Sequence, residues 1–264
     1  MSFQSIKKKV YRKYKTLSLL GSSILGNCVL ESRGRCPICE QDVVFRADNE
    51  WLRDHFLCSK CGSIPRERAL MDVIKMYYPG YRTLDIHESS PGSRGASVKL
   101  KAECENYTTS HFYQDLKLGD THPVGGHRCE NLENLTFDDE SFDLFITQDV
   151  MEHIFDPEKA FKEIARVLKP GGAHIFTVPI INKEHKTECW ASMSDGGAID
   201  YHHEAEYHGN PIDNEGSLVT MHWGYDIANF IMRVANTPTA VVVLDDMEKG
   251  IRAEYIEVLV SRKY

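Results

Sequence analysis

Short apolar runs alternate with longer amphipathic segments along most of the chain. Six runs have the length and composition of buried strands: TLDI (83–86), YTTSHF (107–112), FDLFIT (142–147), AHIFTVPI (173–180), TAVVVL (239–244) and EYIEVLVS (254–261). Strands that alternate with helical segments predict a parallel sheet with crossover helices, and the last two runs predict a terminal antiparallel pair. The predicted fold is therefore α/β, a Rossmann-like, doubly wound and mostly parallel seven-stranded sheet with a terminal antiparallel strand.

Two amphipathic segments are the clearest helices. Between Pro157 and Leu168 the apolar residues fall on one face, and the sequence Lys-Pro-Gly-Gly then ends the pattern. The second helix is predicted to begin with Ser63 as N-cap and Pro65 in its first turn. Its apolar residues recur at helical spacing until a Pro-Gly pair at 79–80, so this helix would join the preceding segment to the main domain.

Four of the eight cysteines form two CxxC pairs with 18 residues between them. Two such pairs predict one tetrahedral structural zinc ion, because four thiolates leave no open coordination position. The predicted ligands are Cys36, Cys39, Cys58 and Cys61. Ordinary buried cysteines and a redox dithiol are the alternatives. The other four cysteines are scattered, which fits a reducing compartment.

The chain is predicted to consist of an arm, a module and a main domain. Residues 1–34 form a basic N-terminal arm, residues 35–64 the zinc-binding module, and residues 65–264 the α/β domain. Residues 181–216 lack periodicity and are rich in His, Gly and Glu. A long irregular segment inside a compact domain is more often functional than inert, so we expect a substrate-side insertion there.

The formal charge of −8 is unevenly distributed. Residues 1–15 contain six lysines and arginines and no acid, so the rest of the protein is more acidic than the total suggests. An acidic body disfavours broad contact with a phosphate backbone. The basic arm is expected to be a solvated or flexible tail, and contact with nucleic acid or an anionic membrane surface is the alternative. No stretch approaches the ~20 apolar residues of a membrane helix, and the N-terminus lacks an apolar signal core. We expect a cytoplasmic protein with no membrane span.

The segment from Glu130 to Pro179 carries a recognisable motif. It reads ENLENLTFDDESFDLFITQDVMEHIFDPEKAFKEIARVLKPGGAHIFTVP. This segment resembles the core of the class I S-adenosylmethionine-dependent methyltransferases, specifically the type 11 group, and the resemblance covers roughly residues 81–180. It implies an enzyme that uses S-adenosylmethionine as its cofactor.

The resemblance implies that the first strand and the turn after it hold the methionine part of the cofactor. The matching residues are Asp85, His87, Glu88, Ser89 and Gly92. The family's Asp-x-Gly-x-Gly-x-Gly pattern is altered here, because His87 and Ser89 stand where glycines normally allow close backbone approach. Glu88 is a candidate for binding a ribose hydroxyl or the cofactor's ammonium group.

Three later segments complete the implied cofactor site. His111 stands at the end of the second strand, where the family has an acidic residue that binds the ribose. Asn131 matches the family's aspartate at the adenine amino group, and Leu132 offers a backbone N–H. Gln148 begins the segment that lines the reactive end of the cofactor.

A methyl group on a sulfonium is already activated, so the enzyme must chiefly hold the acceptor in line and exclude water. A base is needed only if the acceptor is a hydroxyl or a protonated amine. The candidate catalytic residues are Asp149, Glu152, His153 and His208. Capping of a helix N-terminus is the alternative role for Glu152 and His153.

The insertion and the residues after it offer further candidates for substrate contact. Additional histidines stand at positions 202, 203 and 222. A second metal site could combine His202, His203 and His208 with Glu204 or Glu206. Three aromatic side chains could stack on a sugar or a base, or could serve packing alone: Trp190, Trp223 and Tyr225.

The sequence therefore predicts a methyltransferase that acts on a small-molecule acceptor, a saccharide or a natural-product intermediate, by O- or N-methylation. A zinc-containing ribosomal RNA base methyltransferase is one alternative, and the acidic body makes a nucleic-acid partner less favoured. A catalytically silent scaffold is another, because fold alone does not guarantee chemistry. The acceptor atom and the oligomeric state are not set by the sequence.

Overall fold

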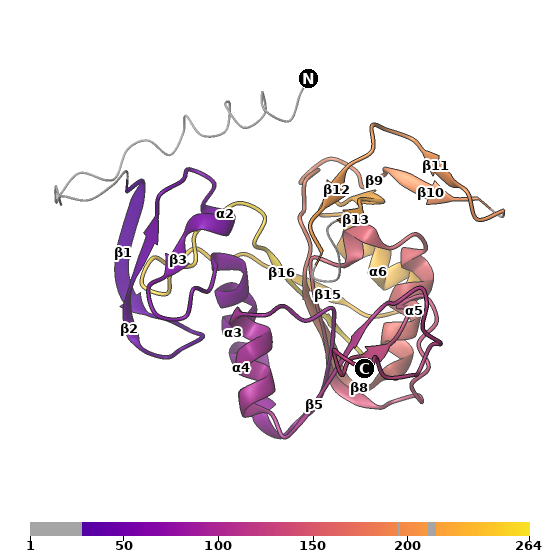
Figure 1. Ribbon diagram of the computed structural model, residues 1–264, viewed down its shortest axis with the longest axis horizontal. Helices are drawn as coiled ribbons and strands as arrows, with labels where there is room; N and C mark the ends of the chain where they lie inside the picture. The colour runs from indigo at the N-terminus through magenta and orange to yellow at the C-terminus, as the bar shows by residue number, and fades with distance from the viewer. Residues whose placement is uncertain (1–27, 195, 211–214) are drawn as a thin grey trace.

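The computed structural model describes residues 28–194, 196–210 and 215–264 (Figure 1). The six basic residues within positions 1–15 lie outside these ranges, so neither a solvated tail nor contact with nucleic acid or a membrane is tested. Within the described ranges, none of the helices has the length and apolar character needed to cross a membrane.

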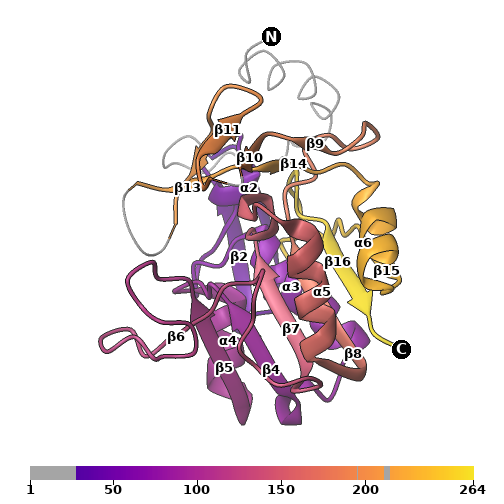
Figure 2. The ribbon, with the colours of Figure 1, turned by 90° about the vertical axis from the view of Figure 1, so that its right-hand side faces the viewer.

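Seven strands form one sheet in the order β15-β16-β8-β7-β4-β5-β6 (Figure 2). Five of them are parallel: β4 (Asp85–Ser89), β5 (Asn106–His111), β6 (Arg128–Cys129), β7 (Phe142–Gln148) and β8 (Leu168–Thr177). The strand β16 (Val258–Arg262) runs antiparallel to both of its neighbours, β8 and β15 (Thr239–Val242). This sheet confirms the predicted fold class.

Helices cover both faces of the sheet. One face carries α3 (Pro65–Tyr77) and α4 (Gly95–Glu103), and the other carries α5 (Pro157–Val167) and α6 (Ile227–Ala235) (Figure 1). The apolar stripe of α5 is buried, and its N-terminus is capped by Asp156, which accepts a hydrogen bond from the Lys159 amide at 3.0 Å. Two short 3₁₀ turns are η2 (Tyr81–Thr83) and η3 (Met151–His153).

The cysteine-containing segment folds as a small antiparallel sheet. Its elements are β1 (Leu30–Arg35), β2 (Asp42–Ala47), α2 (Leu52–His55) and β3 (Leu57–Cys58). We call residues 30–64 the cysteine module. Residues 30–34 were predicted as part of the arm, and this boundary is wrong because they pair with β2 along their whole length.

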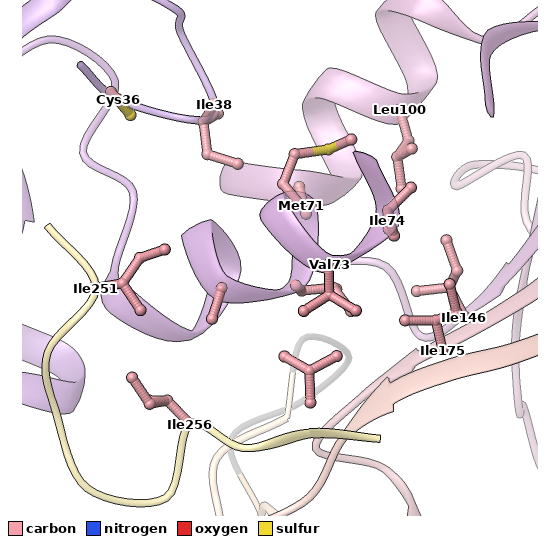
Figure 3. Close-up of a cluster of buried hydrophobic side chains, with 14 of the residues drawn as sticks. Cys36, Ile38, Met71, Val73, Ile74, Leu100, Ile146, Ile175, Ile251 and Ile256 are labelled. Atoms are coloured by element: carbon pink, nitrogen blue, oxygen red, sulfur yellow. The ribbon is translucent and has the colours of Figure 1, made fainter. Parts of the chain in front are cut away.

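The cysteine module shares one hydrophobic core with the main domain. Figure 3 shows Cys36 and Ile38 of the module on one side of α3 and Ile146 and Ile175 of the central sheet on the other. Met71, Val73 and Ile74 of α3 fill the space between them, all with no exposed surface. The module is therefore packed into the fold as a continuous part of it.

Arg68 links the module to the C-terminal part of the chain. Its side chain is fully buried, and its Nη2 donates to the carbonyl oxygens of Phe56, at 2.6 Å, and Gly250, at 2.7 Å. Nη1 donates to the Ser63 carbonyl, and the guanidinium lies 4.8 Å from the ring centroid of Phe45. Burial lowers the pKa of Arg68 to about 10, so it keeps its charge at neutral pH.

The segment predicted as an irregular insertion contains short antiparallel pairs. These are β9 (Glu188–Cys189) with β14 (Met221–His222), β10 (Ala191–Met193) with β11 (Ile199–Tyr201), and β12 (Tyr207–His208) with β13 (Ser217–Leu218). They lie together beyond one end of the central sheet (Figure 2). The insertion therefore reaches past its predicted end at residue 216, to His222.

Two predicted element boundaries are wrong. Ile64, and not Ser63, is the N-cap of α3, and its amide donates to Glu67 at 3.0 Å. The first strand of the sheet was predicted over residues 83–86, whereas β4 runs from Asp85 to Ser89. The strand continues to Ser89 because the polar side chains of His87 and Glu88 find hydrogen-bond partners inside the protein.

We expect Gly34→Ala to destabilise the protein. A Cβ at Gly34 would lie 1.8 Å from the carbonyl oxygen of Glu248, so β1 or the facing loop would have to move. Overpacking of this kind costs about 1–3 kcal/mol, and each kcal/mol lowers Tm by about 2–4 °C in a chain of this size. Gly80→Ala is the matched control, because its added Cβ meets nothing within 4 Å. Thermal unfolding measures both, and equal Tm values would contradict this contact.

Candidate active site

A large cavity opens at the carboxyl ends of the parallel strands. Its volume is about 1300 Å³. The strand ends contribute Ser90, Gly92, Phe112 and Gln148; the cysteine module and α3 contribute Trp51, Arg53 and Arg66; and the insertion contributes Glu206, Tyr207 and His208. Crevices at this edge of open α/β sheets are where such folds bind ligands. Three separate parts of the chain therefore enclose one space.

Asp149 joins the end of β7 to the cysteine module. Its Oδ2 accepts a hydrogen bond from Nη2 of Arg53 at 2.5 Å, and Nε of Arg66 lies 3.2 Å from the same oxygen. Thr177 donates its hydroxyl to the other carboxylate oxygen at 3.0 Å. Asp149 adopts a left-handed backbone conformation, with φ 53°. Three elements thus converge on one carboxylate.

The electrostatics of this ion pair decide the role of Asp149. Burial alone would raise its pKa, but the guanidinium groups of Arg53 and Arg66 lower the pKa of Asp149 to about 2. A carboxylate held in this way is a poor proton acceptor near neutral pH. In the structure the Asp149 side chain holds two arginines on the cavity wall, and its catalytic role stays a prediction.

The other three candidate catalytic residues do come together. Oε1 of Glu152 lies 3.8 Å from Nε2 of His153 and 3.8 Å from Nδ1 of His208. The two imidazole rings are nearly perpendicular, with centroids 5.2 Å apart. His153 and His208 line the cavity, while Glu152 lies beneath them with a relative exposure of 2%. The carboxylates of Glu152 and Glu206 raise the pKa of His208 to about 9.

The remaining histidines of the insertion do not assemble into the alternative metal site. His202 is hydrogen-bonded to the Ser192 hydroxyl at 2.9 Å, and the ring of His203 stacks on Trp190 at 3.9 Å. Within residues 28–194, 196–210 and 215–264, the groups with metal-ligand geometry are the four cysteines and the set of Glu152, His153 and His208. The second metal site built from His202 and His203 was therefore a wrong prediction.

Two of the aromatic candidates serve packing. Trp223 is fully buried in the core that includes α5 and α6, and its indole N–H donates to the Met151 carbonyl at 3.3 Å. Tyr225 donates its hydroxyl to Glu257 at 3.0 Å. Neither lines the cavity. Trp190 stacks between the rings of two histidines, and it is not a cavity residue either.

Gly92 and Gln148 are the two predicted cofactor residues that line the cavity. Gln148 is oriented from behind by Glu88, which accepts its amide N–H at 2.7 Å and also accepts hydrogen bonds from Ser97, at 2.7 Å, and Tyr107, at 2.5 Å. Burial raises the pKa of Glu88, although these hydrogen bonds oppose the shift. Glu88 therefore supports the cavity wall, and its direct contact with the ribose or ammonium group is not supported.

His87 and Asp85 are not cofactor contacts in this fold. His87 bonds to the hydroxyls of Thr108 and Ser110, both at 2.9 Å, and burial lowers its pKa to about 3. Asp85 stands at the opposite end of β4, where Lys169 donates to it at 2.5 Å. Both predictions are wrong, because an inward-facing histidine replaces a glycine turn and because the strand begins at Asp85.

Ser89, His111, Asn131 and Leu132 do not line the cavity. Ser89 and His111 are the final residues of β4 and β5, each 5% exposed. Asn131 accepts a hydrogen bond from the Glu133 amide at 2.9 Å, and Leu132 belongs to the hydrophobic core. Their contacts with the cofactor stay a prediction.

Sequence reasoning missed the cavity residues of the cysteine module and α3. Trp51 and Arg53 lie between the two CxxC pairs, and Arg66 lies in the first turn after them. The available signal was a tryptophan and an arginine between the two CxxC pairs. Tyr255, near the C-terminus, also lines the cavity, and its carbonyl accepts a hydrogen bond from Arg53 at 3.0 Å.

The four cysteines of the module have the geometry that suits one tetrahedral ion. Their sulfur atoms all lie within 4.8 Å of one another, with Cys36 to Cys61 at 3.8 Å and Cys39 to Cys58 at 3.9 Å. A tetrahedral zinc ion with Zn–S bonds of about 2.3 Å separates its sulfurs by about 3.8 Å. The Ser63 hydroxyl lies 3.2 Å from Cys61 and can donate to a thiolate there. These residues therefore fit a structural zinc ion.

Part of the chain is similar to a known family. Residues 98–176 match the family described as "Methyltransferase domain". The chain is 35% identical over 60 residues to the "Ubiquinone biosynthesis O-methyltransferase" of Coxiella burnetii, which is 23% of this chain and 25% of that protein. It is 32% identical over 98 residues to the "Demethylmenaquinone methyltransferase" of Clavibacter sepedonicus, 35% of this chain and 39% of that protein.

The chain thus spans less than half the length of these curated relatives. Among solved structures, an S-adenosylmethionine-dependent methyltransferase from Mesorhizobium loti aligns with 74% of this chain and 98% of its own, at 13% identity and a TM-score of 0.45.

We expect Asp149→Asn to lower the free energy of unfolding by about 2–3 kcal/mol at pH 7, because it leaves the partly buried guanidinium groups of Arg53 and Arg66 without their anion. The folded-state pKa of about 2 lies below the ordinary value of 3.8, so this stabilisation is present above pH 3.8 and is lost as the pH falls toward 2. The difference in the free energy of unfolding between wild type and variant should therefore be smaller at pH 3 than at pH 7. Urea unfolding at both pH values measures it.

The matched control is Asp245→Asn, the same substitution in an exposed ion pair. Asp245 contacts Arg252 at 2.6 Å, and its side chain is 59% exposed. Such pairs contribute about 0–1 kcal/mol. Similar losses in the two variants, or a difference that does not depend on pH, would show that Asp149 does not hold the module against the sheet.

Proposed function

We propose that this protein is an S-adenosylmethionine-dependent methyltransferase that acts on a small-molecule acceptor. The observation that carries the proposal is the cavity at the carboxyl edge of β4, β5, β7 and β8, in a chain whose residues 98–176 match a methyltransferase domain. Its volume of about 1300 Å³ exceeds the roughly 300–1000 Å³ of a typical single-ligand pocket. A cofactor and a small acceptor can therefore be held together.

Gly92, Ser90 and Gln148 would hold the methionine end of the cofactor, since they face the cavity where β4 and β7 end. S-adenosylmethionine, when bound, supplies an activated methyl group on sulfur. The amide of Gln148 is fixed by Glu88 at 2.7 Å, so its orientation is set before any ligand arrives. The aromatic rings of Phe112 and Tyr113, after β5, offer apolar surface for the adenosyl part.

The acceptor would lie between the cysteine module and the insertion. Trp51 and Tyr255 offer aromatic surface there, and Glu206 and His208 offer hydrogen-bonding groups. Aromatic surface combined with polar groups suits a hydroxylated acceptor such as a saccharide or a natural-product intermediate, methylated on oxygen or nitrogen. The curated relatives named for ubiquinone and menaquinone biosynthesis also support a small-molecule acceptor.

A structured RNA is the second candidate acceptor. The cavity lining includes the acidic residues Asp54, Glu67, Asp149, Glu206 and Glu215. Arg53 and Arg66 are drawn to Asp149, so they offer little charge to a phosphate backbone. Binding to structured RNA that weakens steeply with salt would favour this candidate over a small molecule.

Calorimetric titration with S-adenosylhomocysteine separates an enzyme from a catalytically silent scaffold. The proposal requires measurable binding, followed by transfer of a labelled methyl group from S-adenosylmethionine to saccharides or hydroxylated aromatic compounds. A folded protein that binds neither cofactor form would be a scaffold.

Gly92→Val should weaken S-adenosylhomocysteine binding by at least about tenfold, which corresponds to about 1.4 kcal/mol. The nearest atoms to an added Cβ are 3.7 Å and 3.9 Å away, so the protein itself can accept the first carbon, whereas the branched side chain would enter the cavity. Gly80→Val, outside the cavity, is the control. Calorimetry gives the affinity and thermal unfolding checks the fold. Unchanged affinity with unchanged Tm would place the cofactor elsewhere.

We also propose that Cys36, Cys39, Cys58 and Cys61 hold a structural zinc ion. Cys58→Ser should remove one equivalent of zinc and, because Arg53 and Trp51 belong to the same module, should also weaken ligand binding in the cavity by about tenfold or more. Cys189→Ser, an exposed cysteine outside the module, is the control. Metal analysis and calorimetry measure the two effects. Unaltered zinc content in Cys58→Ser would overturn the assignment.

A further inference from the structure

A second group of metal-ligand side chains lies at the cavity, apart from the four cysteines. One carboxylate oxygen of Glu152 and one nitrogen each of His153 and His208 lie within 4.8 Å of one another. Glu152 and His153 belong to η3, directly after β7, and His208 belongs to β12 of the insertion. Figure 2 shows the strands of the insertion above the end of β7.

The carboxylate of Glu152 is buried and lacks a hydrogen-bond partner. Its relative exposure is 2%, and neither Oε1 nor Oε2 is hydrogen-bonded within the part of the chain that the structure describes. The nitrogens of His153 and His208 that face it are both 3.8 Å away, beyond hydrogen-bond distance. Arg53 is a nearby cation, but its guanidinium is bonded to Asp149 and to the Tyr255 carbonyl. A buried carboxylate in this position requires a positive charge.

The outer nitrogens of both histidines already have acceptors. Nδ1 of His153 lies 2.8 Å from the Leu218 carbonyl oxygen, and Nε2 of His208 lies 3.2 Å from a carboxylate oxygen of Glu206. When these outer nitrogens donate, the inner nitrogens are left with lone pairs that point toward Glu152. Histidines that bind metals are oriented in this way, by a carbonyl or a carboxylate on the other ring nitrogen.

We propose that Glu152, His153 and His208 bind a divalent transition-metal cation. Two imidazole nitrogens and one carboxylate oxygen suit zinc, manganese, iron or cobalt, whereas calcium and magnesium favour oxygen ligands alone. Bonds of about 2.0–2.2 Å separate tetrahedral ligands by about 3.4 Å, so the observed 3.8 Å distances need to shorten only slightly. Three protein ligands leave coordination positions open, and His153 and His208 both face the cavity.

The cation would join the insertion to the end of β7 and would place a Lewis acid at the acceptor side of the cavity. If the proposed methyl transfer takes place there, an acceptor oxygen could occupy an open position and lose its proton more readily. This use of the site rests on the proposed function, whereas metal binding itself does not.

The test is a titration of the full-length protein with Mn²⁺, with zinc in the cysteine module left in place. The six-line electron paramagnetic resonance signal of free Mn²⁺ disappears on binding, and thiolate sites do not favour this ion. We expect one Mn²⁺ bound per chain in the wild type, and affinity reduced by at least about tenfold in Glu152→Gln and His208→Ala. Glu206→Gln keeps all three proposed ligands but alters the acceptor of the outer nitrogen of His208, so it should lower the affinity for Mn²⁺ by about 10- to 100-fold.

His202→Ala is the matched control, because this insertion histidine bonds to Ser192 and lies outside the cluster. It should bind Mn²⁺ as the wild type does, and zinc analysis and Tm confirm that each variant keeps its module and fold. No uptake of Mn²⁺, Co²⁺ or Zn²⁺ beyond the cysteine site would overturn the proposal, as would equal uptake by wild type and a folded Glu152→Gln. S-adenosylhomocysteine binding, measured on the same samples, reports separately on the proposed function.

Discussion

The carboxylate of Asp149 between two arginines is the contact on which the rest of the site depends. Arg53 comes from the cysteine module, Arg66 from α3, and Asp149 from the end of β7, so one anion fixes three elements at the cavity wall. Removing a partner from a buried ion pair leaves an uncompensated charge, which is why these elements cannot separate without large cost. The cavity therefore depends on a part of the chain that the methyltransferase match at 98–176 does not include.

A further arginine joins the cysteine module to the rest of the fold through the core between the module and the sheet. Arg68 is fully buried and donates to the carbonyl oxygens of Phe56 and Gly250, so it joins the module to the C-terminal loop. Apolar side chains of α3 fill the space between module and sheet (Figure 3). A metal ion held by the cysteines would thus stabilise more than its own loops, because the module packs against both α3 and the C-terminal loop.

Periodicity and spacing were sufficient for the sheet, for α5 and for the paired cysteines, because these features depend on local sequence. They were not sufficient for polar residues whose partners are distant in the chain. His87 was assigned to a ligand turn, but Thr108 and Ser110 of the neighbouring strand satisfy both of its nitrogens. Asp149 was assigned as a base, and only the fold brings two guanidinium groups to it. The roles of such polar residues depend on their charge state and their hydrogen bonds, and both of these depend on tertiary contacts.

The cluster of Glu152, His153 and His208 shows how a distant segment can complete a site. The pair Glu152-His153 follows β7 directly, and the insertion brings His208 to within 3.8 Å of the same carboxylate oxygen. Because the carboxylate of Glu152 is buried, it needs a cation or a protonated group beside it. In the absence of a metal ion, protonation of His208 supplies that charge, which agrees with its raised pKa. The position of the insertion over the cavity is therefore coupled to the charge that balances Glu152.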